Sequence, residues 1–265
     1  MIDLKGKSAV VTGGSRGIGR ACALRLAQAG ASVAILDRTD WKTPETESCS
    51  GQIRRSGGTA VSYELDVSDS AQVDAVFERI AADRGIDILV NNAGVLHAGS
   101  ATETTDEVWR NQFAINVDGT FFCTRAALRA MLDEGSGGKI INVASISGLR
   151  ANPGFAAYCA SKAAIVNFTR QVGIDYGAQG INVNGVAPGF VETEMTAIYP
   201  PEIRAALEGQ TPNGKWASPD HIADAVLFLA SSLSDHICGE IVAVDGGWLV
   251  GTPVVVPAGT SGTVE

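Results

Sequence analysis

The stretch Thr12-Gly13-Gly14-Ser15-Arg16-Gly17-Ile18-Gly19 decides the fold, because it joins a short apolar run to the start of a helical pattern. Glycines at such a junction allow a tight turn, and they let backbone N–H groups and the positive end of the helix approach a pyrophosphate. Close packing of a strand against a helix is another reason for glycines there. The strand–turn–helix context favours a dinucleotide-binding turn.

Short apolar runs alternate with helix-period segments along the rest of the chain. The predicted strands cover residues 7–12, 32–36, 60–65, 86–91, 139–143, 182–186 and 241–244. The predicted helices cover residues 18–28, 70–82, 106–132, 156–176 and 219–230. The strands are apolar almost throughout, which indicates burial on both faces of a parallel sheet. We therefore expect an α/β fold, a single Rossmann-type doubly wound parallel seven-stranded sheet with helices on both faces.

Two segments fall outside this alternation. Residues 1–250 form the expected dinucleotide-binding and catalytic domain, within which residues 190–216 are the expected substrate lid. Residues 251–265 form a C-terminal tail that contains Pro253-Val254-Val255-Val256-Pro257, a sequence that favours an extended conformation. The tail either packs across a neighbouring subunit or is a frayed terminus, and both interpretations stay open.

Composition narrows the function classes. With 45% hydrophobic and 18% charged residues, the 265-residue chain has enough apolar material for a compact core. Its net charge of −9, without a basic patch, argues against a nucleic-acid partner. We expect no secretion leader and no membrane span, and the five cysteines lack CxxC spacing, as in a cytoplasmic protein with reduced thiols. His97, His221 and His236 lack metal-ligand spacing, so no metal site is predicted.

The second predicted strand ends in Leu36-Asp37, about twenty positions after the glycine run. A carboxylate there can accept hydrogen bonds from the adenosine ribose, although a solvated aspartate at a strand end is also common. Such a carboxylate would repel the extra phosphate of NADP, so Asp37 predicts NAD as the preferred cofactor. Arg16 and Arg38 could bind that phosphate if Asp37 turned away.

Together with motifs further along the chain, the glycine run resembles the short-chain dehydrogenase/reductase family. The spacing of Gly13, Gly17 and Gly19 is similar to the family pattern TGxxxGxG, and Asn91-Asn92-Ala93-Gly94 is similar to its NNAG turn. Ser145, followed by Tyr158 and Lys162, resembles the family's serine and Tyr-x-x-x-Lys. The resemblance covers residues from about 5 to 250.

The resemblance implies a set of site residues. The implied catalytic residues are Asn116, Ser145, Tyr158 and Lys162. The implied cofactor-binding residues are Gly13, Ser15, Arg16, Gly17, Ile18, Gly19, Asp37, Asp66, Val67, Asn92, Ala93, Gly94, Tyr158, Lys162, Pro188, Gly189, Val191 and Thr193. The expected substrate-binding residues are Ser145, Arg150 and Tyr158. Singly, each has an ordinary structural alternative: Asp66 could cap a helix, Pro188-Gly189 could be a plain turn, and Arg150 could be a solvated loop residue.

The chemistry of the tyrosine and lysine supports the resemblance. Tyr158 and Lys162 are four positions apart in a predicted helix, so they share a face. A free phenol has a pKa of ~10, and a nearby ammonium and a positive nicotinamide ring are expected to lower that pKa. Tyr158 could then exchange the substrate's proton, while the Ser145 hydroxyl orients the substrate oxygen.

The expected function is that of an NAD(P)-dependent short-chain alcohol dehydrogenase/reductase. It would transfer a hydride between NAD(H), or less favourably NADP(H), and a small polar secondary alcohol or ketone such as a polyol, a sugar-derived hydroxy acid or a cyclic alcohol. The alternatives are a 3-oxoacyl carrier-protein reductase that uses NADPH, and a cofactor-binding sensor or scaffold without turnover. The resemblance also implies a homotetramer.

Overall fold

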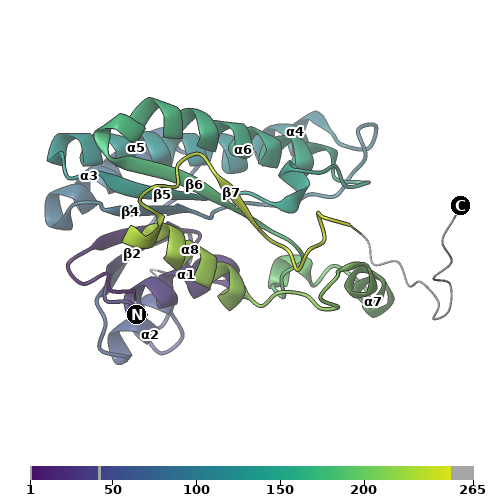
Figure 1. Cartoon of the computed structure of the whole chain (residues 1–265), viewed down its shortest axis with the longest axis horizontal. Coiled ribbons are helices and arrows are strands. Elements are labelled where there is room, and N and C mark those ends of the chain that lie inside the picture. Colours follow the sequence, from purple (N-terminus) through teal and green to yellow (C-terminus); the bar gives the residue numbers. More distant parts are fainter. Residues whose placement is uncertain (1, 41–42, 252–265) are drawn as a thin grey trace, which may run out of the picture.

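A computed structural model gives the structure of the chain, and it describes residues 2–40 and 43–251 (Figure 1). The predicted tail, from residue 252 onward, lies outside the described residues. Seven strands form one sheet: β1 (Ser8–Thr12), β2 (Ser32–Asp37), β3 (Ala60–Glu64), β4 (Ile88–Asn91), β5 (Gly138–Val143), β6 (Ile181–Pro188) and β7 (Ile241–Val244). They pair in the order β3-β2-β1-β4-β5-β6-β7, and every pairing is parallel. The predicted doubly wound parallel sheet is confirmed.

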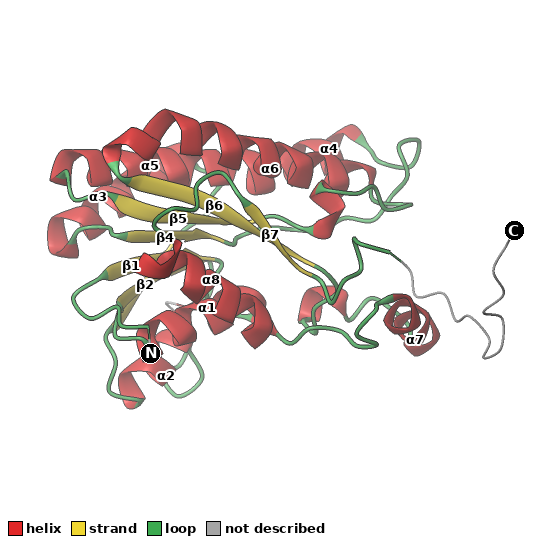
Figure 2. Cartoon of the chain, viewed as in Figure 1, coloured by secondary structure: helices red, strands yellow, loops and turns green. Residues whose placement is uncertain are grey.

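Helices cover both faces of this sheet (Figure 2). One layer contains α3 (Ser70–Arg84), α4 (Asp106–Phe113), α5 (Gly119–Glu134) and α6 (Ala156–Tyr176). The opposite layer contains α1 (Gly17–Gln28), α2 (Cys49–Arg55) and α8 (Pro219–Ala230). Among the described residues, none of these helices combines the length and the apolar character that crossing a bilayer requires.

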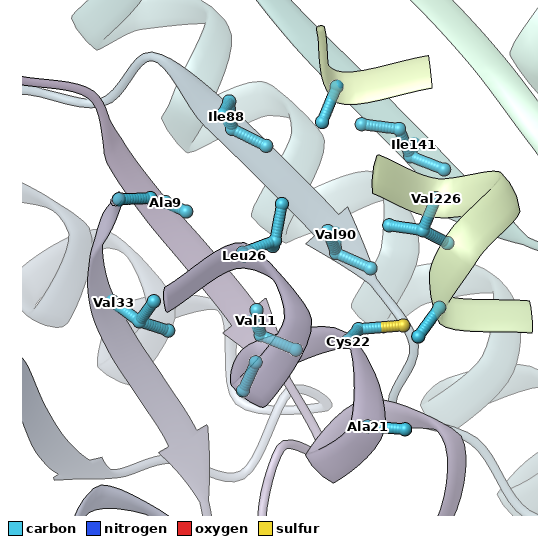
Figure 3. Close-up of a cluster of buried hydrophobic side chains, with 14 of the residues drawn as sticks. Ala9, Val11, Ala21, Cys22, Leu26, Val33, Ile88, Val90, Ile141 and Val226 are labelled. Atoms are coloured by element: carbon cyan, nitrogen blue, oxygen red, sulfur yellow. The ribbon is translucent and has the colours of Figure 1, made fainter. Parts of the chain in front are cut away.

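The core explains why the strands are apolar at nearly every position. Successive strand residues point to opposite faces, so Ala9 and Val11 pack in the layer of α1 and α8 while Val10 packs in the other. Figure 3 shows the first of these clusters, in which Leu26 of α1 and Val226 of α8 approach the sheet. All five side chains are fully buried. Both faces of each central strand therefore need apolar side chains.

Three elements differ from the sequence prediction. The helix expected over residues 106–132 contains a π-helical turn, η2 (Ala114–Asp118), between α4 and α5. Helix α2 was not predicted, and it is held by polar contacts: Ser48 caps it, and buried Asp40 accepts a hydrogen bond from the N–H of Cys49 at 2.8 Å. Helix α7 (Pro201–Gln210), inside the expected lid, was also missed, because it buries no residue and so lacks a core-facing apolar stripe.

Residues 190–216, the predicted lid and called the lid below, are held by stacked aromatic rings. Phe190 stacks on Trp216 with ring centroids 5.5 Å apart, and Tyr199 meets Trp216 edge-on at 5.9 Å. Trp248, which follows β7, meets Phe190 edge-on at 5.9 Å. Such pairs add stability beyond the area they bury, so the lid has a defined position beside the sheet. The lid also contains a short helix, η5 (Glu194–Thr196).

Candidate active site

The strand order reverses between β1 and β4, and ligands of such sheets bind outside the carboxyl ends of the strands at that point. The glycine turn follows β1. Gly13 and Gly17 have φ of +62° and +54°, which favours glycine. A Cβ on Gly19 would lie 2.2 Å from the Gly13 carbonyl oxygen, whereas one on Gly17 would meet only the side chain of Thr193. Packing thus explains Gly19, and Gly17 leaves its backbone open beside the start of α1, as a pyrophosphate requires.

Replacing Gly19 tests this close approach. Gly19→Ala should destabilise the protein by about 1–3 kcal/mol, because overpacked groups that cannot relax cost that much, and here the contact is with backbone. Gly209→Ala is the matched control, since a Cβ there meets nothing within 4 Å in α7. Thermal unfolding checks both variants. Equal stability of the two would contradict the packing explanation of Gly19.

The Asn-Asn-Ala-Gly turn after β4 holds the glycine turn in place. The side-chain N–H groups of Asn92 donate to the carbonyl oxygens of Thr12 and Gly13, at 3.0 and 3.1 Å. The backbone N–H groups of Asn92 and Ala93 both donate to the Thr12 hydroxyl at 3.0 Å. Asn92 and Gly94 also line the cavity described below. These residues shape the place where the cofactor is expected.

Asp37, the last residue of β2, is fixed by four hydrogen bonds. Its Oδ2 accepts from the N–H and hydroxyl of Ser15, at 3.2 and 2.6 Å. Its Oδ1 accepts from the N–H and hydroxyl of Thr39, at 3.1 and 2.9 Å. The carboxylate is therefore held at the carboxyl end of the strand, beside the glycine turn. Arg16 points elsewhere and forms an ion pair of 2.7 Å with Glu194 in the lid.

Asp66 and Val67 follow β3 at the same edge of the sheet. Burial by itself would raise the pKa of Asp66, but hydrogen bonds from the hydroxyl and N–H of Ser68 outweigh it and hold that pKa below its ordinary value. The side chain that caps α3 is Asp69, so a capping role for Asp66 is excluded. The Asp66 carboxylate remains available to a ligand as an ionised acceptor.

The tyrosine and lysine lie one turn apart on α6, and Ser145 follows β5. Lys162 Nζ lies 5.8 Å from the centroid of the Tyr158 ring and donates to the Val143 carbonyl oxygen at 2.8 Å. Ser145 and Lys162 are both buried. All three side chains line one cavity. The structure thus brings together three of the four residues predicted to be catalytic.

Asn116, the fourth, lies on the π-helical turn η2 and is completely buried. Its Oδ1 accepts from the N–H of Val95 at 2.8 Å, and its Nδ2 donates to the Val95 carbonyl oxygen at 3.0 Å and to Ser161 at 3.1 Å. A Cβ added to Gly94 would lie 3.2 Å from Asn116 Oδ1 and 3.7 Å from Lys162 Nζ. The asparagine therefore lies beside the lysine, and its side chain holds the backbone of Val95. Single π-helical turns within α-helices occur frequently at functional sites.

The acid–base properties of the pair differ from the expectation in one respect. Burial raises the pKa of Tyr158 to about 12, although the Ser145 hydroxyl acts in the opposite direction. Burial also lowers the pKa of Lys162 to about 8. The expected lowering of the tyrosine's pKa, which also depends on the positive nicotinamide ring, is not reached by the protein groups alone, because burial of the phenol has the largest effect on that pKa.

These pKa directions predict the pH dependence of alcohol oxidation, which needs Tyr158 as phenolate. The active form, with Tyr158 as phenolate and Lys162 charged, carries one proton fewer than the fully protonated pair. The pair loses its first proton near pH 8, the lower of the two pKa values. Below that pH, kcat/KM should rise about tenfold per pH unit and then level off. Lys162→Met should move the inflection upward, toward the tyrosine's value of about 12. A wild-type profile that is flat from about pH 6 to 9 would contradict a base of this kind.

The remaining predicted residues divide between the cavity and the surface. Ile18, Pro188, Gly189, Val191 and Thr193 line the cavity with the catalytic side chains. Arg150 does not: it is exposed, and its guanidinium lies over the Trp248 ring, 4.9 Å from the centroid. Among residues 2–40 and 43–251, no three His, Cys, Asp or Glu side chains gather as around a metal ion.

Sequence reasoning missed several side chains that line the cavity. These are Leu96, Ser147, Asn152, Phe155, Phe190, Met195 and Tyr199. They come from loops after β4 and β5 and from the lid, where no period marks which side chain points inward. The available signal was position alone, since loops after the carboxyl ends of parallel strands line such sites.

Comparisons with known proteins identify the family of the chain. The family model described as enoyl-(acyl carrier protein) reductase matches residues 13–249. The chain is 38% identical to a meso-2,3-butanediol dehydrogenase of Serratia marcescens, over 91% of this chain and 94% of that one. It is 37% identical to a 3-oxoacyl-acyl-carrier-protein reductase of Aquifex aeolicus, over 93% and 98%. A gluconate 5-dehydrogenase of Burkholderia cenocepacia, solved with NADP and tartrate, is 36% identical with a TM-score of 0.88, over 94% and 98%.

The matches span nearly the whole chain and its relatives, and they include the glycine turn, the lid and the Tyr158 helix. Doubly wound sheets of this kind bind dinucleotides outside the carboxyl ends of the strands, and the glycine turn and the cavity lie at that edge. The chain belongs to the short-chain dehydrogenase/reductase family and is an NAD(P)-dependent alcohol dehydrogenase/reductase.

Proposed function

We propose that the enzyme prefers NAD and interconverts a small polar secondary alcohol and its ketone, with Tyr158 as general acid and base. The observation that carries this proposal is the cavity shared by Ser145, Tyr158 and Lys162 at the carboxyl edge of the sheet, beside the glycine turn. The nicotinamide, when bound, supplies the acceptor or donor of the hydride. The rest of the chemistry falls to the side chains of this chain.

Each side chain has a distinct role in alcohol oxidation. The Ser145 hydroxyl donates a hydrogen bond to the substrate oxygen and fixes its position. The Tyr158 oxygen takes the proton from the substrate hydroxyl as the hydride leaves the carbon that bears this hydroxyl, so proton and hydride together account for the two hydrogens lost. Lys162, held by the Val143 carbonyl oxygen, places a positive charge beside the tyrosine ring and favours the phenolate. Ketone reduction reverses these transfers.

The preference for NAD is supported by the fixed carboxylate of Asp37. Its hydrogen bonds with Ser15 and Thr39 oppose a rotation that would clear the way for a 2′-phosphate. Arg16, one of the two arginines that could oppose this preference, is paired with Glu194. A ribose hydroxyl can bind Asp37 by replacing one of the hydroxyl donors, whereas a phosphate would meet a like charge.

The carrier-protein reductase remains the second candidate, because several relatives carry that name. Such an enzyme needs basic residues to dock an acidic carrier. Two arginines of α5 could serve this role, Arg125 and Arg129, but both face Asp74, each at 3.5 Å. Their positive charge is partly compensated within the chain, which favours a free small-molecule substrate.

A turnover screen tests the proposal and separates it from a cofactor sensor. Calorimetric titration with NAD and NADP measures binding, and nicotinamide absorbance then measures turnover of secondary alcohols, ketones and an acyl-carrier substrate with both cofactors. We expect NAD-dependent oxidation of small polar alcohols. Binding without turnover would support a sensor, and turnover of the acyl carrier alone would support the reductase.

A further inference from the structure

A second polar corner lies beside Ser145 in the cavity. Ser147 belongs to the short helix η3 (Ile146–Gly148), and Asn152 follows in the next loop. The Asn152 side-chain N–H donates to the Ser147 hydroxyl oxygen at 2.7 Å, and the Ser147 N–H donates to the Ser145 hydroxyl oxygen at 3.1 Å. All three residues line the cavity that contains Tyr158.

The hydrogen bonds of this corner are incomplete. The Ser147 oxygen accepts from Asn152, and within the described part of the chain its own hydrogen has no acceptor. The Asn152 Oδ1 likewise accepts no hydrogen bond from the described residues. One free donor and one free acceptor therefore lie next to each other at the cavity wall. A hydroxyl, which both donates and accepts, matches that pair.

The charge of the cavity restricts what else the corner could bind. Lys162 is the one charged residue among the described residues that line it, and its ammonium is bound to the Val143 carbonyl oxygen. Leu96, Phe155 and Met195 contribute apolar walls. Arg150, the one cation among the residues predicted to bind the substrate, stacks on Trp248 instead. A substrate carboxylate here would lose its water without gaining an ionic partner, which is costly.

We propose that Ser147 and Asn152 bind a second, uncharged hydroxyl of the substrate, and that the substrate is a neutral vicinal diol or the corresponding α-hydroxyketone. This proposal rests on the proposed function, because it needs Ser145 and Tyr158 to hold the reacting oxygen. The Ser147 N–H donates to the Ser145 hydroxyl oxygen, so the residue of the second binding point adjoins the residue that holds the reacting oxygen. A vicinal diol, whose two hydroxyls are on neighbouring carbons, is the substrate that fits adjoining binding points.

The test compares substrates that differ in the second group. Vicinal butanediol, the monohydric secondary butanol and hydroxybutyrate are each oxidised with NAD, and kcat/KM is measured for wild type, Ser147→Ala and Asn152→Ala. A hydrogen bond contributes about 0.5–1.5 kcal/mol, so each variant should lose roughly 2- to 13-fold of the preference for the diol over the butanol. The loss should fall mainly on KM for the diol, since the second hydroxyl does not react.

Two controls separate recognition from structure. Ser147→Thr keeps the hydroxyl and should retain more of the diol preference than Ser147→Ala. Ser232→Ala removes an exposed serine from another short helix, η6 (Ser232–Ser234), outside the cavity, and should leave the preference unchanged. If Asn152→Ala does not fold, Ser147→Ala decides alone.

The outcomes distinguish a failure of the neutral-diol proposal from a failure of the proposed function. An undiminished diol preference in Ser147→Ala, or faster turnover of hydroxybutyrate than of the diol, would overturn the neutral-diol proposal while leaving the proposed function intact. No turnover of any alcohol by wild type, despite NAD binding, would overturn the proposed function and this proposal with it.

Discussion

Tyr158→Phe should lose most turnover while keeping its affinity for the cofactor. The substitution removes only the hydroxyl oxygen that exchanges the substrate's proton, and the ring keeps its place on α6 beside Lys162. General acid–base catalysis contributes about 10²–10⁴-fold, so kcat should fall by that factor. Steady-state kinetics and calorimetric titration with NAD measure the two properties separately.

Tyr176→Phe is the matched control for this experiment. It removes the same oxygen from the last residue of the same helix, outside the cavity. Its kcat should stay close to that of wild type. Near-normal turnover in Tyr158→Phe would exclude Tyr158 as the acid–base group, and a loss of NAD binding would mean that the substitution disturbed the cofactor site as well.

The second large effect is the discrimination between cofactors. We expect the specificity constant for NAD to exceed that for NADP by about 10- to 1000-fold, because like charges at ~4 Å repel by ~1 kcal/mol in water and by ~4 kcal/mol at an effective dielectric constant of ~20. Asp37→Ser should remove most of this ratio by improving the use of NADP. Kinetics with each cofactor at a fixed alcohol concentration measure the ratio.

The control for this prediction is Asp133→Ser, which removes an exposed carboxylate near the end of α5. The cofactor ratio should not change in that variant. If wild type uses NADP with the higher specificity constant, the assignment of Asp37 is wrong, and Arg38 would be the residue to examine next.

Much of the fold could be predicted from the sequence, because the features that build it are local. Val10 and Val11 are both apolar although they face opposite layers, which is the pattern of a strand covered on both sides. Gly13 and Gly17 mark the turn, since their positive φ values suit glycine. The four-residue spacing of Tyr158 and Lys162 placed them on one helix face.

The features of the fold and the site that could not be predicted depend on contacts between residues distant in sequence. The π turn at Asn116 forms where that side chain bonds to Val95 and Ser161, which no helical period reveals. For the protein groups alone, the pKa of Tyr158 is set mainly by how deeply the fold buries the phenol, which the spacing of charges in the sequence does not reveal. Arg150 was predicted to bind the substrate, but it stacks on the ring of Trp248, which lies almost a hundred residues later in the sequence.

The most direct measurement of the central claim follows nicotinamide absorbance when wild type and Tyr158→Phe are mixed with NAD, or in parallel with NADP, and a series of small secondary alcohols. The account predicts formation of reduced cofactor by wild type, at a rate that rises with pH up to about 8, and a rate in Tyr158→Phe that is lower by about 10²–10⁴-fold. Equal rates in the two proteins, or no reduction of either cofactor with any alcohol, would contradict an alcohol dehydrogenase that works through Tyr158.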